Sequence, residues 1–138
     1  SPAALQHLVA IESDIRTNIA SAEAFADAVA ALPGNDQLSK TAAKQVEMVD
    51  AAYKKMSSAQ KNRVSAATLD VLANKQAAVA ANEKAAADLQ KSVAALPKGA
   101  DIDTDAEVQA LNAAMNAYNG MNDAQKSWVD AATVANLQ

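Results

Sequence analysis

The chain has no cysteine, only three glycines and three prolines, and few aromatic side chains (3% of 138 residues). Without cysteine it can form no disulfide scaffold, no thiolate metal site and no cysteine nucleophile. With so few glycines, a strained catalytic turn has few places to form. The one histidine, His7, has no obvious partner side chain, and no phosphate-binding loop, nucleophile elbow or HExxH motif is present. The sequence therefore predicts a protein that is not an enzyme and uses no cofactor.

Charge and hydropathy bear on two further classes of partner. The net charge is −4 and the pI is about 4.8, and the cations do not form the clustered footprint that nucleic-acid binding needs. No apolar run approaches the roughly 20 residues of a membrane-spanning helix. We therefore expect no nucleic-acid partner and no transmembrane segment. No signal peptide precedes Ser1, which says little about secretion because a signal is removed from the mature protein.

Alanine makes up about a quarter of the chain, well above its average usage. It is the best helix former because its side chain loses no entropy on ordering. It also buries little apolar area. This composition favours long helices packed closely over a thin core, and it argues against a deep pocket.

An internal repeat organises the chain. The segment Ala-Ala-Tyr-Lys-Lys-Met that begins at Ala51 matches Asn-Ala-Tyr-Asn-Gly-Met, which begins at Asn116, an offset of 65 residues (116 − 51). Upstream, Val-Ala-Ala-Leu-Pro ending at Pro33 recurs as the pentapeptide ending at Pro97, an offset of 64 (97 − 33). One inserted residue in the loop after the proline reconciles the two offsets, and loops are where insertions are tolerated.

The repeat predicts unit 1 at 1–65, unit 2 at 66–130 and the start of a third long helix at 131–138. Helices joined by short loops pack antiparallel, and a long helix that leaves one unit opens the next. We therefore predict an all-α fold of two tandem three-helix-bundle repeats, in an elongated, spectrin-like rod that shares its long connecting helices. Residue 138 falls partway through a further copy of the repeat. This indicates either a piece of a longer array or a natural truncated cap.

Apolar residues in steps of three and four predict a first helix at about 2–32. Ser1 and Pro2 are a typical helix start, while Pro33 and Gly34 are a stop in which the glycine relieves the turn. Further helices are expected at about 40–56, 58–64 and 67–96, although 58–96 could also be one continuous helix. Three capping boxes are predicted: Ser57 with Gln60, Thr104 with Glu107, and Asn122 with Gln125.

The segment from Leu96 to Val129, with its Leu-Pro helix end and the later run Ala-Tyr-Asn-Gly-Met-Asn-Asp-Ala-Gln-Lys-Ser-Trp-Val, resembles helical repeats of Gram-positive bacterial surface proteins. These include S-layer proteins, wall-anchored adhesins and modules appended to secreted glycosidases. Both copies match the family pattern, with Met56 and Met121 where leucine is usual. The resemblance implies an extracellular location at the cell surface or cell wall. It implies a spacer or ligand-binding role with neighbouring repeats as partners, and it transfers no catalytic residues.

Two functions follow as hypotheses. The first is a non-catalytic structural segment that spaces or presents other domains. The alternative is a binding module for a cell-wall polymer, a glycan or a host protein through an exposed helix face. Trp128 is the first candidate residue, because Arg63 stands at its position in the first copy; we expect it to be partly exposed or to contact a neighbouring unit. With Tyr53 and Tyr118 it could form a sugar-stacking platform, although the tyrosines fall in the apolar register.

The second candidate is a small basic patch. It could meet an anionic wall polymer, or it could be a solvated helix end where cations suit the dipole. The recurring pairs Gln60–Lys61 and Gln125–Lys126 could mark a shared binding face, or they could cap a short helix beside a solvated lysine. The basic patch consists of Lys54, Lys55, Lys61 and Arg63.

The third candidate is a weak calcium site at Asp101, Asp103 and Asp105. Alternating acids begin an EF-hand loop, but Ala106 stands where that loop needs glycine and Asn112 where it needs glutamate. The other interpretation is that these acids favour a helix N-terminus.

Overall fold

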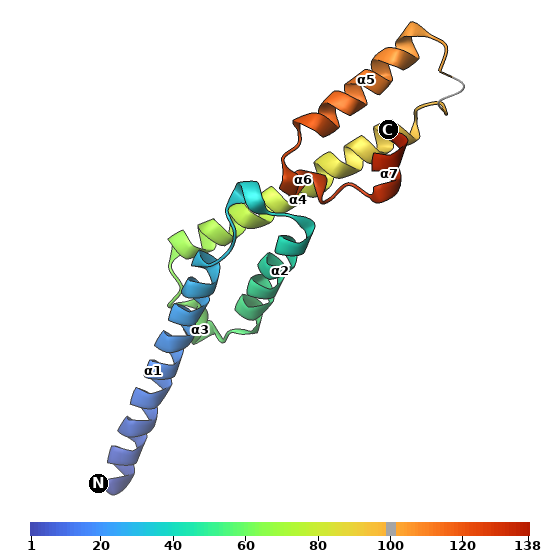
Figure 1. The fold of residues 1–138 in the computed structure, drawn as a ribbon. Helices are drawn as coiled ribbons and strands as arrows, with labels where there is room; N and C mark the ends of the chain where they lie inside the picture. The colour runs from blue at the N-terminus through green and yellow to red at the C-terminus, as the bar shows by residue number, and fades with distance from the viewer. Residues whose placement is uncertain (99–101) are drawn as a thin grey trace. The chain divides into compact units, whose positions relative to one another are not determined.

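The computed structural model describes residues 1–98 and 102–138, and every regular element in this part of the chain is a helix (Figure 1). The all-α fold is thus confirmed. None of these helices combines the length and the hydropathy that crossing a lipid bilayer requires. In chain order they are α1 (Pro2–Ala30), the 3-10 helix η1 (Asn35–Gln37), α2 (Lys40–Lys55), α3 (Ser58–Lys61), α4 (Ala66–Ala94), α5 (Asp105–Gly120), α6 (Asp123–Lys126) and α7 (Ala131–Asn136).

Local signals set the helix ends within one turn of the predicted positions. All three predicted capping boxes are present, with each side chain and backbone group bonded reciprocally. The end of α1 differs from expectation in one detail: Gly34 has φ of −57°, so it does not adopt a left-handed conformation. A Cβ atom at Gly34 would instead lie 2.8 Å from Oδ1 of Asp36, so glycine is suited to this close approach.

Residues 58–96 contain two helices, and a cap begins the second of them. α3 ends at Lys61, and α4 starts afresh at Ala66. The Ser65 hydroxyl accepts the backbone N–H of Thr68 at 3.1 Å, as an N-capping side chain does. The sequence also allowed one continuous helix over 58–96, and the structure has α3 and α4 instead.

The same helix start occurs three times along the chain. It opens α1, α4 and α7, at spacings of 64 (65 − 1) and 65 (130 − 65) residues. Each time, a side-chain oxygen at the cap accepts the N–H three residues later: Ser1 from Ala4, Ser65 from Thr68, and Asp130 from Thr133.

The described chain forms two compact units. The first comprises residues 1–32 and 44–74, and the second comprises 33–43 and 75–138. Both divisions fall inside a helix, so α2 and α4 contribute residues to each unit. The predicted repeat boundary at residue 65 stays a prediction, because it describes sequence similarity whereas these units describe packing.

In the first unit α1 packs against α3, and one ring contact joins it to α2. Phe25 stacks on Tyr53, with ring centroids 5.3 Å apart. The N-terminal half of α1 extends beyond the other helices of this unit (Figure 1). Buried residues of the unit include Ala22, Phe25, Val29, Val46 and Leu72.

The second unit packs the C-terminal part of α4 against α5, with α6 and α7 closing one side. Small side chains let the helices approach closely, as the alanine content predicts. Its buried cluster consists of Ala86, Leu89, Val93, Ala114, Val129 and Leu137.

Glu107 and Asp130 accept hydrogen bonds at the starts of helices, and the fold favours their ionised forms. Hydrogen bonds from the Thr104 hydroxyl, and then from the backbone N–H groups of Thr104 and Asp103, lower the pKa of Glu107 below the ordinary glutamate value. The hydroxyl and then the backbone N–H of Thr133 lower the pKa of Asp130 in the same way. Both carboxylates therefore stabilise the folded state while they are ionised.

We expect the variant Glu107→Gln/Asp130→Asn to lose less stability in acid than the parent chain. Because the folded-state pKa values are lowered, the carboxylate contribution is present above the unfolded values of about 4.3 and about 3.9. It disappears as the pH falls through the lower folded values. The amides keep capping ability but do not titrate. Urea-denaturation midpoints from neutral pH to about pH 2 measure this.

The matched control is Asp70→Asn, which removes an exposed carboxylate that makes no hydrogen bond to described residues. It should follow the parent chain. Equal acid sensitivity in the parent and the double variant would contradict the role of the two caps.

Candidate functional site

The main polar constellation of the second unit surrounds the backbone carbonyl of Leu38, a fully buried residue (0% exposed) just before α2. Its oxygen accepts Nδ2–H of Asn82, in α4, at 3.1 Å and Nε1–H of Trp128, after α6, at 3.1 Å. Asn82 is itself buried. A carbonyl that lies outside a helix and away from water must find its donors within the protein. These two side chains provide them.

Further contacts hold the same loop. The hydroxyl of Ser127 accepts the backbone N–H of Lys40 at 2.9 Å, and α6 packs against η1. Ser39 caps the same helix start by accepting the N–H of Ala42 at 3.1 Å. The first N–H groups of a helix have no partner within it. One serine from the loop and one from the C-terminal region thus satisfy two of them.

Trp128 lies half-buried, with its ring packed against the hydrophobic cluster of the second unit. Its indole N–H is bonded to Leu38, which belongs to the first copy of the predicted repeat. A position at which the two copies differ thus joins segments of both copies within one compact unit. A ligand-binding role for Trp128 stays a prediction.

The predicted basic patch lies in the first unit and is only partly assembled. Lys54 forms an ion pair with Asp50 at 2.6 Å. Lys61 donates to the carbonyl of Lys54 at 3.4 Å, which agrees with cations at a helix C-terminus. Lys55 and Arg63 are exposed, and Arg63 lines a separate hollow beside α1.

The lysines of the repeated Gln-Lys pairs have a partner that the sequence analysis missed. Nζ of Lys61 lies 5.2 Å from the ring centroid of Tyr53, and Nζ of Lys126 lies 5.1 Å from that of Tyr118. These distances suit a cation–π interaction. The signal was available, because the tyrosine and the lysine are eight residues apart in both copies (61 − 53 and 126 − 118). The glutamines cap as predicted.

The acidic loop organises the start of α5. Glu107 accepts the N–H groups of Asp103 and Thr104, and Asp105 opens the helix. Within residues 1–98 and 102–138 no group of three or more acidic, histidine or cysteine side chains is placed to hold a metal ion. Asp101, the first residue of the proposed calcium site, lies outside the described residues.

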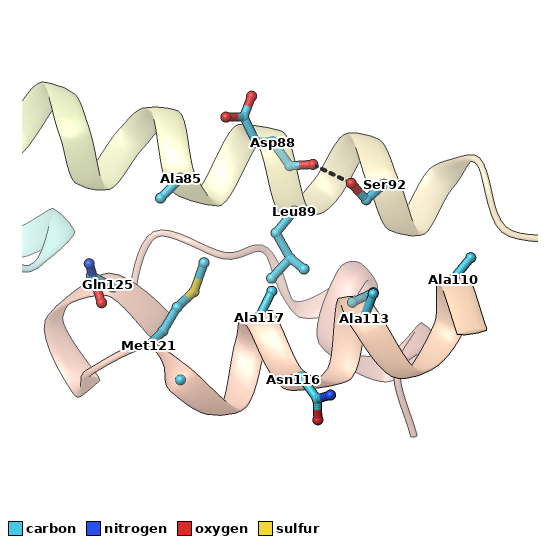
Figure 2. A pocket seen from close by; sticks show the side chains of 12 residues that line it. Ala85, Asp88, Leu89, Ser92, Ala110, Ala113, Asn116, Ala117, Met121 and Gln125 are labelled. Atoms are coloured by element: carbon cyan, nitrogen blue, oxygen red, sulfur yellow. Dashed lines mark hydrogen bonds between the residues drawn. The ribbon is translucent and has the colours of Figure 1, made fainter. Parts of the chain in front are cut away.

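A hollow of about 700 Å³ lies between α4 and α5 (Figure 2). Alanines of both helices face it, and Leu89 points from α4 toward α5. Its rim is polar and carries Asp88, Ser92, Asn116 and Gln125. Such a lining can hold a ligand with an apolar face and hydrogen-bonding groups at its edge.

Side-chain volume explains why this hollow belongs to the second unit. One end of the hollow is lined by Ala85 and Gln125. The residue of the first unit that corresponds to Ala85 is Ser21, whose hydroxyl accepts Nε2–H of Gln60 at 3.2 Å. Elsewhere two counterparts in the first unit are larger: Phe25 for Leu89 and Val49 for Ala114. The counterpart of Ala113, Met48, is 71% exposed and does not fill the corresponding space.

Asn82 was not predicted as a site residue. It lies in a helix whose neighbours are mostly alanine, and its acceptor is 44 residues away in the sequence. One signal was present: Asn18 occupies the same place in the first copy (82 − 18 = 64). A polar residue kept at the same register of two helices points to a shared partner.

We expect Trp128→Phe and Asn82→Leu to destabilise the chain more together than the sum of their separate effects. Each substitution keeps the approximate shape and leaves the Leu38 carbonyl one donor, at a cost of about 1 kcal/mol. The double variant leaves a buried acceptor unpaired, which adds about 1 kcal/mol or more beyond additivity. Urea denaturation of the four proteins measures the coupling.

The matched cycle combines Asn82→Leu with Ser65→Ala, a cap near the other end of α4. These distant sites share no partner, so their costs should add. Additive costs in the first cycle would show that the carbonyl does not depend on the two donors jointly.

A scan against protein-family models and searches of curated proteins and of solved structures find no match to this chain. Its function is therefore inferred from its residues and their contacts.

Proposed function

We propose that this chain is a non-catalytic structural segment of a bacterial cell-surface protein, either an S-layer protein or a wall-associated one. In this proposal, three-helix repeats follow one another in a spectrin-like rod and act as a spacer. The extracellular location rests on the resemblance of the Leu-Pro helix ends and the Ala-Tyr to Gln-Lys segments to such repeats.

The observation that carries the proposal is the bonding of the Leu38 carbonyl. A spacer made of repeats gains its stability from contacts between neighbouring repeats. Here a loop of the first predicted copy is bound by Asn82 and Trp128 of the second. Asn82 lies in α4 and Trp128 in the turn after α6, and both side chains are bonded to the chain's own backbone.

The course of α4 supports the same function. It runs without interruption from Ala66 to Ala94 and contributes residues to both compact units. A long helix shared by successive repeats is what the proposed spacer requires.

The titratable groups support a non-catalytic role. Glu107 and Asp130, whose pKa values are lowered, both accept capping hydrogen bonds at helix starts. Catalytic groups with shifted pKa values are expected to converge on a cleft. These two have structural partners instead.

The second candidate function is a binding module for a cell-wall polymer, a glycan or a host protein. The hollow between α4 and α5 favours it, because an apolar floor with a polar rim suits a sugar. The exposed Lys55 and Arg63 could add attraction for an anionic polymer.

We expect small-angle X-ray scattering of the monomer to give a radius of gyration above about 20 Å. Two 29-residue helices, each about 43 Å long, dominate a rod of this kind. A compact globule of the same length would have a radius of about 14 Å. A value close to that of the globule would overturn the rod and, with it, the spacer function.

If the binding function holds, the chain should sediment with purified cell wall that carries its anionic polymer. Lys54→Ala/Lys55→Ala or Trp128→Ala should then reduce the bound fraction several-fold. Lys84→Ala/Lys91→Ala is the charge-matched control, because it removes two lysines outside the patch. Circular dichroism checks that each variant is folded. Absence of binding by the parent chain would favour the spacer, and unchanged binding by both test variants would remove the proposed faces.

A further inference from the structure

The hollow between α4 and α5 contains a hydrogen-bond donor that has a partner in the first unit and lacks one in the second (Figure 2). In the first unit, Nε2–H of Gln60 donates to the hydroxyl of Ser21 at 3.2 Å. The corresponding residues of the second unit are Gln125 (125 − 60 = 65) and Ala85 (85 − 21 = 64). Alanine offers no side-chain acceptor, and Nε2 of Gln125 makes no hydrogen bond to the described residues.

A capping box holds this donor in a fixed orientation. Oε1 of Gln125 accepts the backbone N–H of Asn122 at 3.0 Å, while the Asn122 side chain accepts the N–H of Gln125 at 2.8 Å. Only the oxygen of an amide can accept an N–H, so the first bond fixes which end of the Gln125 amide carries the nitrogen. Figure 2 shows this nitrogen on the side of α4, toward Ala85. The hollow thus has an oriented donor at the place where the first unit supplies a hydroxyl.

The polar rim of the hollow also belongs to the second copy alone. Three positions of the rim are alanines in the first copy, namely Ala24, Ala28 and Ala51. The residues that replace them, at offsets of 64, 64 and 65, are Asp88, Ser92 and Asn116. The second copy therefore combines smaller side chains within this face with polar side chains around it.

The rim groups have hydrogen-bonding capacity left over. Oδ2 of Asp88 pairs with Lys84, which leaves Oδ1 as an acceptor. The Ser92 hydroxyl donates to the Asp88 carbonyl and can still accept a hydrogen bond. The side chain of Asn116 is exposed and makes no hydrogen bond to the described residues. Together with Gln125, the rim offers both donors and acceptors around an apolar floor.

The same side of the helix pair is open in the first unit. Ala24 and Ala51 are exposed there, and Met48 is 71% exposed. This side is therefore an outer surface of each unit, and what distinguishes the second unit is the lining of that surface.

We propose that this hollow binds a neutral carbohydrate, and that one sugar hydroxyl takes the place of the Ser21 hydroxyl by accepting Nε2–H of Gln125. The alanines and Leu89 contact an apolar face of the sugar ring, while Asp88 and Asn116 bond hydroxyls at its edge. The volume of about 700 Å³ falls within the range of about 300–1,000 Å³ for ligand pockets. This inference rests on the second proposed function, a binding module, and names its ligand class and its site.

The charge of the rim favours a neutral ligand over an anionic one. The carboxylate of Asp88 repels a phosphate or a carboxylate that enters the hollow, whereas a sugar hydroxyl can donate to it. A β-linked glucose ring suits such a site, because its hydroxyls are equatorial and its two faces carry only C–H groups. The ligand of this hollow thus differs from the anionic polymer considered for the basic patch of the first unit.

An NMR titration of the ¹⁵N-labelled chain with cellobiose, a β-linked disaccharide of glucose, tests the proposal. We expect the side-chain amide signals of Gln125 and Asn116 to shift saturably. The dissociation constant should lie in the millimolar range, because each hydrogen bond between neutral groups adds little in water. Sorbitol, which has hydroxyls but no ring face, should cause no saturable shift at the same concentrations.

Two variants remove the free donor in different ways. Ala85→Ser gives Gln125 the internal acceptor that Gln60 has, and it should weaken binding about fivefold. Gln125→Glu keeps the oxygen that caps α6 but has no N–H to donate, and it should weaken binding by a similar factor. Circular dichroism checks that both variants are folded.

Each variant has a matched control. Ala87→Ser makes the same change as Ala85→Ser at an exposed position of α4 that does not line the hollow. Gln60→Glu makes the same change as Gln125→Glu in the first unit. Both controls should bind cellobiose like the parent chain.

Three results would overturn the proposal. The first is a parent chain whose amide signals do not shift saturably with cellobiose. The second is unchanged affinity in both Ala85→Ser and Gln125→Glu. The third is a shift of the same signals when the protein concentration is raised without sugar, which would assign the hollow to a second copy of the chain. Sedimentation with cell wall tests the basic patch and Trp128, so wall binding without cellobiose binding would reject this site and leave the binding module standing.

Discussion

The carbonyl of Leu38 lies outside any helix and out of reach of water, so its need for donors constrains everything around it. Asn82 and Trp128 must both approach it, and Ser127 binds the next helix start. These bonds place the loop before α2 in the second compact unit. In packing the loop therefore belongs to the second compact unit, although in sequence it belongs to the first copy of the predicted repeat.

The alanine content makes such shared contacts necessary. Alanine permits close helix approach but contributes little burial, so a bundle of this composition has a thin core. The chain compensates with extra caps, with stacked lysine–tyrosine pairs and with one long helix that serves two units. Leu72 near the start of α4 and Leu137 at the end of α7 are both buried within their own compact units.

Side-chain volume distinguishes the hollow between α4 and α5 from the corresponding place in the first unit. Alanine and leucine in the second unit replace valine and phenylalanine of the first, and the space between α4 and α5 stays open. The opposite holds in the N-terminal part of α1, where large apolar side chains such as Leu5 and Leu8 are exposed. The hollow therefore lies in the second unit, whereas these exposed apolar side chains lie in the first.

The sequence by itself determined the all-α fold, the helix ends and the three capping boxes, because periodicity and caps act over a few residues. It left open whether residues 58–96 form one helix, although the cap that begins α4 is local, because Ser65 accepts the N–H of Thr68 three residues later. The sequence also singled out Trp128, but only as a place where the copies differ. Its acceptor lies 90 residues away, and a buried carbonyl has no signature in sequence because every residue carries one. Only the packed structure could decide that this tryptophan and Asn82 meet at the same oxygen.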